Sequence, residues 1–554
     1  MKSQKKHSLH VEIQTHRKNP IGLIRSTFRE NGKTKHETFA RITGKTLAEL
    51  KVIQAAFRGD AVIVDNPLKT SDSREFGASK ALLELASDIG LDKVIYSRRE
   101  PWVRSVLAMI VGRILYQNSK LALVHSKDIT SLWELVGINE EHLNVEEHCY
   151  EPMDRLLQRQ QAIQSQLAKQ HLKNGTVVLY DITSTYFEGE YENSELVDYG
   201  YNRDKKKGHK QVVIGLICNE QGCPVCVEVF SGNTKDDQTV EDKILEMKEN
   251  YGLGEIVFVG DRGMVTRTHQ NRLEAQDGIK FITSLTHNEI QELLGKRTIQ
   301  LELFDEKELV EIEHPDILGK RLILCRNPET ARKEKATREA LMNSLGQKLD
   351  QIASGATKKK ASAENIAERV GRAFEKYKMG KFCEYEIIDV EVGKQKKPGK
   401  GLTWKWNQEK VEKESLIDGC YIITSTVATD RMTKEEVVAT YKGLSVVEQA
   451  FRNLKTASLQ MRPIHHKTDE RIKAHIFICM LSYYLQWHVM QRLRPLFESN
   501  GEFADREWTL ERVFETLKCI RKMKVEMNGV ELPHIDSPND QQQKILDLLG
   551  VKIA

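Results

Sequence analysis

TVVLYDITST (residues 176–185) is the stretch that decides the fold, because a run of apolar and β-branched residues leads to Asp181 and small hydroxyl residues follow it. A second run of this kind, EIVFVGDRGM (residues 255–264), leads to Asp261 and a glycine. Such runs are typical of buried strands. A carboxylate at the end of a buried strand is costly unless it meets a metal, a base or a hydrogen-bond network. The two runs therefore predict a sheet that brings both aspartates together at the strand ends.

The stretch YKGLSVVEQAFRNLK (residues 441–455) predicts one amphipathic helix. It contains no proline, and its polar residues recur at steps of three and four. At about 100° per residue these steps keep a set of side chains on one helix face: Tyr441, Leu444, Glu448, Arg452 and Lys455. Taken alone, this pattern favours a surface helix with a Glu–Arg pair that contributes a few tenths of a kcal/mol.

The three acidic residues together make a stronger pattern. Asp181, Asp261 and Glu448 form an oxygen-only ligand set, which suits magnesium or manganese and offers nothing that favours zinc. Ions held in this way polarise a phosphoryl oxygen, activate a water or a 3′-hydroxyl, and stabilise the leaving oxygen. Basic groups beside Glu448 then become candidate phosphate ligands.

These residues resemble the DDE transposases of bacterial insertion sequences, in the cut-and-paste branch that carries a Tyr-x2-Arg-x3-Glu-x6-Lys signature and a β-rich insertion before the glutamate. Tyr441, Glu448 and Lys455 fall at the positions of the signature, whereas Leu444 occupies its arginine position. The resemblance extends over about residues 176–490 and includes further matching stretches: DITSTYFEG (181–189), FSGNTKD (230–236), GDRGM (260–264) and residues 451–481.

The resemblance implies an enzyme that binds insertion-sequence ends, cleaves them by metal-dependent phosphodiester hydrolysis and transfers the 3′-OH strand to target DNA. It implies Asp181, Asp261 and Glu448 as the catalytic residues and metal ligands, with two Mg²⁺ ions or Mn²⁺ in their place. The expected partners are double-stranded DNA and a second copy of the chain in a synaptic homodimer. Two alternatives stay open: a metal-dependent nuclease of the same fold that does not join DNA, and a non-catalytic, transposon-derived DNA-binding protein.

Several further residues are candidate DNA contacts. Tyr441, Arg452 and Lys455 are expected to hold phosphates beside the scissile bond, with Arg452 supplying part of the charge that Leu444 lacks. Arg462, in a basic loop, is expected to face phosphate, and His475 to orient Glu448. The segment DYGYNRDKKKGHK (198–210) predicts a mobile loop at the active edge, where the lysines at 205–207 either contact the DNA backbone or belong to a solvated turn.

Trp404 and Trp406 lie two residues apart after a basic turn and therefore share one face of a strand. In the branch resembled, the insertion holds a base flipped out of a DNA hairpin, and stacking on an aromatic ring contributes roughly 1–3 kcal/mol per base. Both tryptophans are accordingly candidate DNA-binding residues. A pair that closes a small β core is the slightly favoured alternative.

The expected fold class is α/β, with a ribonuclease-H-like catalytic core interrupted by a mainly β insertion domain. The core strands are predicted at 176–182, 211–218, 224–230, 256–260 and 280–285, and its helices at 237–250 and 265–276. The expected parts are an N-terminal β-hairpin (1–45, with arms LHVEIQTH and GLIRSTF), a helical DNA-binding region (46–174), the first part of the core (175–287), the insertion domain (288–418), the second part of the core with the catalytic Glu helix (419–495) and a C-terminal helical tail (496–554).

The composition sets broader limits. The 554 residues carry a formal net charge of +4, so DNA binding must depend on local basic patches. No apolar run reaches the roughly 18 residues of a membrane span, and a cytoplasmic, nucleoid-associated protein is expected. No Gly-x4-Gly-Lys-Ser/Thr loop is present, which argues against a nucleotide-driven mechanism. Cys218, Cys223 and Cys226 give only a weak zinc pattern, because no second pair follows at zinc-site spacing.

Overall fold

The computed structural model describes residues 9–15, 19–30, 32–59, 69–204, 206, 208–235, 253–264, 270, 277–296, 299–300, 309–313, 319–358, 361–392, 397–498, 508–527 and 530–553. The helices predicted at 237–250 and 265–276 lie outside these residues, apart from residue 270. The chain divides into two compact units, which we describe separately: Met1–Arg74 with Arg521–Ser537, and Glu75–Ile520 with Pro538–Ala554. In the described part of the chain, no helix is both long and apolar enough to cross a membrane.

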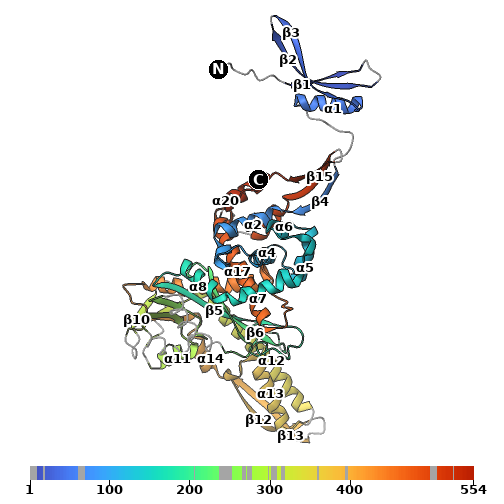
Figure 1. Ribbon diagram of the computed structural model, residues 1–554. Helices are drawn as coiled ribbons and strands as arrows, with labels where there is room; N and C mark the ends of the chain where they lie inside the picture. The colour runs from blue at the N-terminus through green and yellow to red at the C-terminus, as the bar shows by residue number, and fades with distance from the viewer. Residues whose placement is uncertain are drawn as a thin grey trace. The chain divides into compact units, whose positions relative to one another are not determined.

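The first unit contains two small antiparallel sheets. One joins β1 (Leu9–Gln14), β2 (Ile21–Glu30) and β3 (Lys33–Ile42), and α1 (Leu47–Arg58) follows it (Figure 1). The predicted hairpin is therefore a three-stranded meander: its two expected arms are β1 and β2, and β3 was missed. Nearly every side chain of β3 is exposed, so this strand lacks the buried face that makes an alternating pattern recognisable.

The second sheet of this unit has the order β16-β15-β4. Its strands are β4 (Lys69–Glu75), β15 (Arg521–Met527) and β16 (Val530–Ile535). The predicted C-terminal helical tail (496–554) therefore contains two strands that were missed, besides the helices α19 (Leu510–Lys518) and α20 (Asp540–Leu549). β15 is rich in charged residues, and it pairs with a strand more than 400 positions away in the sequence, which no local pattern predicts.

The larger unit contains a group of helices and a sheet. A long helix, α17 (Asp469–Arg492), is buried along most of its length and packs against α4 (Pro101–Leu115) and α7 (Glu151–Gln158). An apolar surface on all sides is typical of a helix inside a core. Other helices of this group are α2 (Gly77–Asp88), α3 (Leu91–Ile95), α5 (Lys120–His125) and α8 (Gln160–His171).

His466 lies where this helical group meets the loop that precedes α17. Its ring makes an edge contact with Tyr150 at 5.8 Å between ring centroids and lies 5.3 Å from the ring of His475. Burial is the main cause that lowers the pKa of His466 to about 3. The charged or titratable groups that face it lower the pKa further, and these are Lys120, Arg471, Arg113 and His465. The imidazole is therefore neutral in the folded protein.

We expect His466 to make the fold sensitive to acid. An unfolded histidine takes up a proton near pH 6.5, whereas the folded one does not until about pH 3, so its stabilising contribution is present above pH 6.5 and is lost as the pH falls. The free energy of unfolding of the wild type should fall between pH 7 and pH 5. In His466→Gln this fall should be smaller by up to about 2 kcal/mol. Urea unfolding at both pH values tests this, with the exposed His142→Gln as control. Parallel pH profiles for wild type and His466→Gln would contradict it.

The central sheet contains the five strands that the sequence predicts for a ribonuclease-H-like core. From one edge inwards the order is β7-β6-β5-β8-β9, in which β5 is antiparallel to β6 and parallel to β8. All five predicted strands are confirmed: β5 (Thr176–Tyr186), β6 (Gln211–Asn219), β7 (Pro224–Ser231), β8 (Ile256–Val259) and β9 (Ile279–Ser284).

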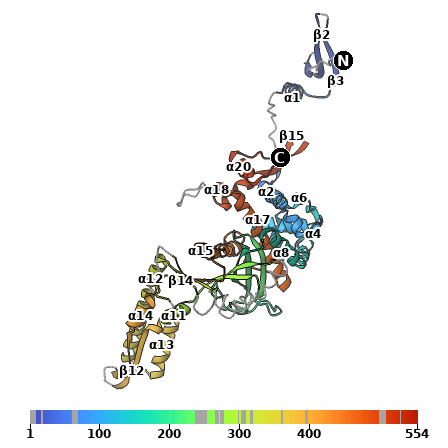
Figure 2. The same cartoon turned by 90° about the vertical axis from the view of Figure 1, so that its left-hand side faces the viewer.

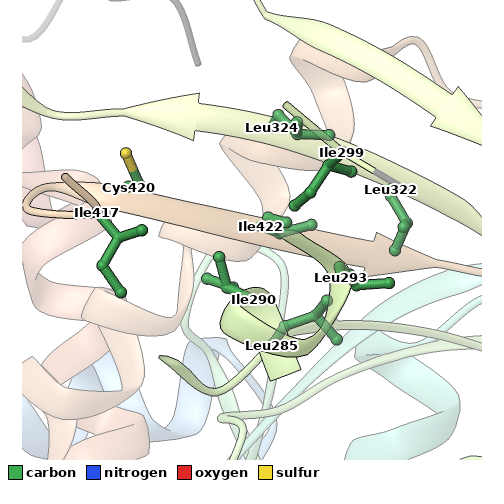
Figure 3. Packing of buried hydrophobic residues seen from close by; sticks show 9 residues of the cluster. All are labelled: Leu285, Ile290, Leu293, Ile299, Leu322, Leu324, Ile417, Cys420 and Ile422. Atoms are coloured by element: carbon green, nitrogen blue, oxygen red, sulfur yellow. The ribbon is translucent and has the colours of Figure 1, made fainter. Parts of the chain in front are cut away.

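Three further strands extend this sheet beyond β9. They are β14 (Cys420–Ser425), β11 (Arg321–Arg326) and β10 (Val310–Glu313), each antiparallel to its neighbour. Figure 3 shows Ile422 of β14 between side chains of α11 (His287–Gly295) and of β11. This apolar cluster makes β10 and β11 part of the core sheet, although the sequence assigned them to the insertion.

The rest of the segment 288–418 is a lobe in which helices predominate. It comprises α12 (Pro328–Lys358), α13 (Ala363–Tyr377), β12 (Cys383–Val392), β13 (Lys397–Trp406) and α14 (Gln408–Ser415) (Figure 2). The expectation of a mainly β insertion was therefore wrong for the described residues. The charged surface of α12 hides a narrow apolar seam, with Leu345, Leu349 and Ile352 fully buried, and this seam rather than β pairing forms the core of the lobe.

Candidate active site

The register of two parallel strands brings Asp181 and Asp261 together. Leu179 of β5 pairs with Val259, the last residue of β8. Two residues further along each chain are Asp181 and Asp261. Because side chains alternate with a period of two, both carboxylates start from equivalent positions in the pleat. Asp181 lies within β5, which continues to Tyr186 past the end of β8, so its expected place at the end of a strand was wrong.

Asp181 is half-buried and accepts a hydrogen bond from the backbone N–H of Ile182 at 2.8 Å. Burial is the main cause that raises the pKa of Asp181 to about 6, and the negative charges of Glu448 and Asp261 raise it further. Arg203 acts in the opposite direction. Glu448 and Asp261 therefore lie close enough to Asp181 for their charges to disfavour its ionised form, and a divalent cation relieves this electrostatic condition.

The predicted helix over 441–455 consists of three consecutive segments: α15 (Lys434–Lys442), α16 (Leu444–Arg452) and a π-helical turn (Asn453–Ala457). Gly443, whose backbone is in the right-handed helical region, separates the first two, so the expectation of one uninterrupted helix was wrong. Leu444 and Lys455 are buried, whereas Glu448 and Arg452 are exposed. The buried face of α16 packs against β5 and β6, which places Glu448 beside the aspartates.

Tyr441 belongs to the same site although it is on α15. Its hydroxyl group donates a hydrogen bond to the Oγ of Ser284, at the end of β9, at 2.7 Å. Burial raises the pKa of Tyr441, and the charges of Asp261 and Glu448 also raise it. The phenol is therefore neutral at physiological pH and faces two of the three carboxylates.

Two arginines hold the loop that leads into α15. Arg321 of β11 is buried and donates from Nη1 to the carbonyl oxygens of Val427 and Met432 at 2.9 and 2.8 Å. Its Nε and Nη2 bind the carboxylate of Glu311 at 2.7 and 2.9 Å. In addition, Arg431 binds the carbonyl oxygen of Gly175 at 2.7 Å, just before β5. The start of α15 is thereby tied to β11 and to the start of β5, the strand that carries Asp181.

The connection between β5 and β6 supplies two residues that the sequence analysis did not single out. The backbone N–H of Arg203 donates to the Oγ of Ser184 in β5 at 3.1 Å, which holds the main chain of this residue beside β5, and the charge of Arg203 reaches Asp181. Asp204, the next residue, binds Lys455 Nζ at 3.3 Å and Arg462 Nη1 at 2.8 Å. The glycine- and lysine-rich composition of residues 198–210 indicated a loop at the active edge, but it did not distinguish these two positions. Of its lysines, 205 and 207 lie outside the described residues.

We expect Asp204→Asn to weaken the fold and to strengthen DNA binding. The carboxylate neutralises Lys455 and Arg462, whose side chains are only 10% and 15% exposed, so its loss should lower the free energy of unfolding by about 2–3 kcal/mol. DNA should bind more tightly, because phosphate no longer has to displace a carboxylate. Urea unfolding and fluorescence anisotropy measure the two effects.

A suitable control is Glu192→Gln, an exposed acid on the same connection. A drop in DNA affinity specific to Asp204→Asn would mean instead that the carboxylate orients the two cations for DNA.

The two tryptophans of β13 lie on one face of the strand and pack toward α12. Their rings meet edge-on at 5.3 Å between centroids, and Trp404 Nε1 donates to Asp350 at 3.1 Å. Both contact the apolar core of the lobe. This geometry agrees with the favoured interpretation of a tryptophan pair that closes a small core. Stacking on a flipped base stays a prediction.

Potential metal ligands gather at a second place. The side chains of His171, Cys223 and His488 have ligand atoms within 4.8 Å of one another, and no other group of three in the described residues meets this criterion. Cys223 therefore lies with two histidines and not in a zinc site with Cys218 and Cys226. Asp181, Asp261 and Glu448 therefore do not form a group of three by this criterion. Two-metal sites do not require such a group, since their ions lie about 3.5–4 Å apart.

The family model described as the transposase DDE domain matches residues 173–485, more than half of the chain. A search of curated proteins found no match. The matched region begins just before β5, which carries Asp181, and ends within α17, after the helix that carries Glu448. Enzymes with this domain cleave and transfer DNA, and they generally use divalent metal ions. The chain belongs to the transposase DDE domain family.

Proposed function

We propose that the protein binds the ends of an insertion sequence, hydrolyses a phosphodiester bond there and transfers the resulting 3′-OH strand to target DNA. The observation that carries the proposal is the matched register of Asp181 and Asp261 beside Glu448. A nuclease of the same fold shares this arrangement, so the joining step is the part of the proposal that needs a direct test.

The donor set fits hard divalent cations. Two neighbouring carboxylates disfavour the ionised form of Asp181 at this edge of the sheet, and Arg203 is the cation whose charge reaches it. Asp181, Asp261 and Glu448 would hold two Mg²⁺ ions, or Mn²⁺ in their place. When bound, these ions would supply Lewis-acid stabilisation of the charge that develops on the phosphoryl, attacking and leaving oxygens.

The surrounding side chains have separate tasks in this proposal. Lys455 and Arg462 would exchange Asp204 for phosphates next to the scissile bond, since both already hold an anionic group. The neutral hydroxyl group of Tyr441 would donate a hydrogen bond to a phosphate oxygen of the DNA, in place of its hydrogen bond to Ser284. Arg452 is exposed one turn beyond Glu448 and would contact the backbone further out. Water and a 3′-hydroxyl are the nucleophiles, and no covalent enzyme intermediate is involved.

The second proposed feature is assembly. Joining two element ends to one target requires both ends in one complex, so we propose that two copies of the chain form a synaptic homodimer on DNA. Size-exclusion chromatography with light scattering, with and without end DNA, tests this proposal. Complexes that contain one chain on one DNA end, and never two ends together, would contradict the proposed dimer.

The direct test of the function uses DNA that carries the ends of the element from which the gene comes, with a supercoiled plasmid as target. With Mg²⁺ we expect cleavage at the ends and covalent products in which a 3′ end is joined to the plasmid. EDTA should abolish both products. Cleavage without joined products would favour the nuclease, and binding without cleavage in Mg²⁺ or Mn²⁺ would favour a DNA-binding protein that has lost catalysis.

A further inference from the structure

A cavity of about 370 Å³ lies between the helical group and the loop that follows the catalytic helix. Its walls come from the end of α4, the start of α5, Tyr150, residues 460–466 and α17. None of the described residues that line it is acidic, and six of them are basic: Arg113, Lys120, Arg462, His465, His466 and His475. A cavity with this lining is suited to an anion.

Two of these cations are deeply buried. The exposed fraction is 6% for Arg113 and 5% for Lys120. Arg113 Nη1 donates to the carbonyl oxygens of Gln117 and Gln460 at 3.1 and 3.4 Å, while its Nε has no hydrogen-bond partner within the described chain. Lys120 Nζ lies 3.2 Å from Nδ1 of His475. Burial of a cation without a counter-ion is unfavourable, so a group that brings negative charge into the cavity would stabilise the fold.

The effect of this uncompensated charge is visible in the neighbouring groups. Burial lowers the pKa of Lys120 to about 8, and the charge of Arg113 lowers it further. Burial, followed by the charges of Lys120 and Arg113, also lowers the pKa of His475. His475 already donates from Nε2 to the carbonyl oxygen of Met461 at 3.1 Å, whereas the neutral imidazole of His466 still offers an N–H donor to an oxyanion. The cavity therefore combines two buried cations with additional hydrogen-bond donors.

The cavity and the candidate active site share one residue, Arg462. This side chain lines the cavity, and it also binds Asp204 at 2.8 Å. Its guanidinium lies 5.0 Å from the ring centroid of Tyr186, the last residue of the strand that carries Asp181. A polyanion that replaced Asp204 would thus have its next charges close to the cavity, and the polyanion that this enzyme family handles is DNA.

We propose that the cavity around Arg113, Lys120 and His475 binds a backbone phosphate of the DNA substrate, separate from the phosphates at the scissile bond. The proposal rests on the function proposed above. It assigns a DNA contact to the helical region before the catalytic domain, and it gives the buried cations a counter-ion. A free phosphate anion has the same chemistry, so the test must distinguish the two sources.

The test compares the wild type with Lys120→Met and with Lys80→Met, a surface lysine that pairs with Glu84. Pyrophosphate is the probe for free anions, and thermal unfolding in EDTA is the readout. We expect pyrophosphate to raise the Tm of the wild type and of Lys80→Met but not of Lys120→Met. Without pyrophosphate, Lys120→Met should be at least as stable as the wild type, because it removes an unpaired buried charge. If Lys120 had a purely structural role, Lys120→Met would instead be less stable than the wild type.

The second readout is the affinity for end DNA as a function of salt concentration, also in EDTA. Lys120→Met should weaken binding about tenfold and lower the slope of log K against log salt by about 0.9, the value for one phosphate contact, while Lys80→Met should leave both unchanged. An unchanged slope with loss of the pyrophosphate effect would overturn the DNA assignment and leave a free-anion site. No difference in either readout would overturn the proposal entirely. If the wild type responds to pyrophosphate but does not bind DNA, the proposed function fails and the anion site remains.

Discussion

Asp181→Asn is expected to reduce DNA cleavage by about 10³-fold or more while DNA binding persists. The amide keeps the size of the side chain but loses the charge that a hard cation requires. Metal ions supply several kcal/mol of transition-state stabilisation, and each 1.36 kcal/mol corresponds to a factor of ten in rate. Asp261→Asn and Glu448→Gln should have effects of similar size, because all three carboxylates share one site. Single-turnover cleavage of labelled end DNA measures the loss.

The appropriate control is Glu435→Gln, an exposed acid in the first turn of α15 that makes the same chemical change outside the site. Its cleavage rate should stay within about twofold of the wild type, since surface substitutions generally have small effects. Near wild-type cleavage by any one of the three site variants would remove that residue from the ligand set. Loss of DNA binding in all three would instead indicate that the substitutions disturb the fold.

Arg321→Met is expected to cause the largest loss of stability among the substitutions considered. The guanidinium is buried, and all its hydrogen bonds go to Glu311 and to the loop that leads into α15. Removal of one partner from a buried ion pair costs about 3–5 kcal/mol, and here two loop carbonyl groups lose their donor as well. Because the side chain of Glu311 is 22% exposed, water can partly replace the arginine, so we expect about 3 kcal/mol.

Urea unfolding measures this loss, with Arg372→Met as the matched control. Arg372 is 77% exposed and pairs with Glu368 on the surface of α13, so its replacement should change the free energy of unfolding by less than about 0.5 kcal/mol. The double variant Arg321→Met, Glu311→Leu should recover part of the loss, because it no longer leaves an unpaired carboxylate. Equal stabilities of the Arg321 and Arg372 variants would show that Arg321 does not hold the loop.

The sequence by itself determined much of the catalytic core. The five strands from 176 to 284 are apolar and β-branched, and one face or both faces of each are buried, so their composition identifies them. Asp181 and Asp261 stand out because carboxylates are rare in such runs. Glu448 required the resemblance to a family, since a helix with Glu–Arg spacing is common on protein surfaces. Gly443 was visible in the sequence, but the division of the predicted helix into α15 and α16 at this residue was not foreseen.

Only the tertiary structure decided which long-range partners meet. The pairing of β11 with β14 and of β15 with β4 joins segments about 100 and 450 residues apart, and local patterns contain no information on such pairing. Arg203, Asp204 and Lys120 have no distinctive spacing, so their roles follow from what they face and not from their neighbours in the chain. Residue type and periodicity fix what a segment can bury, whereas electrostatic partners and sheet neighbours depend on how distant segments pack.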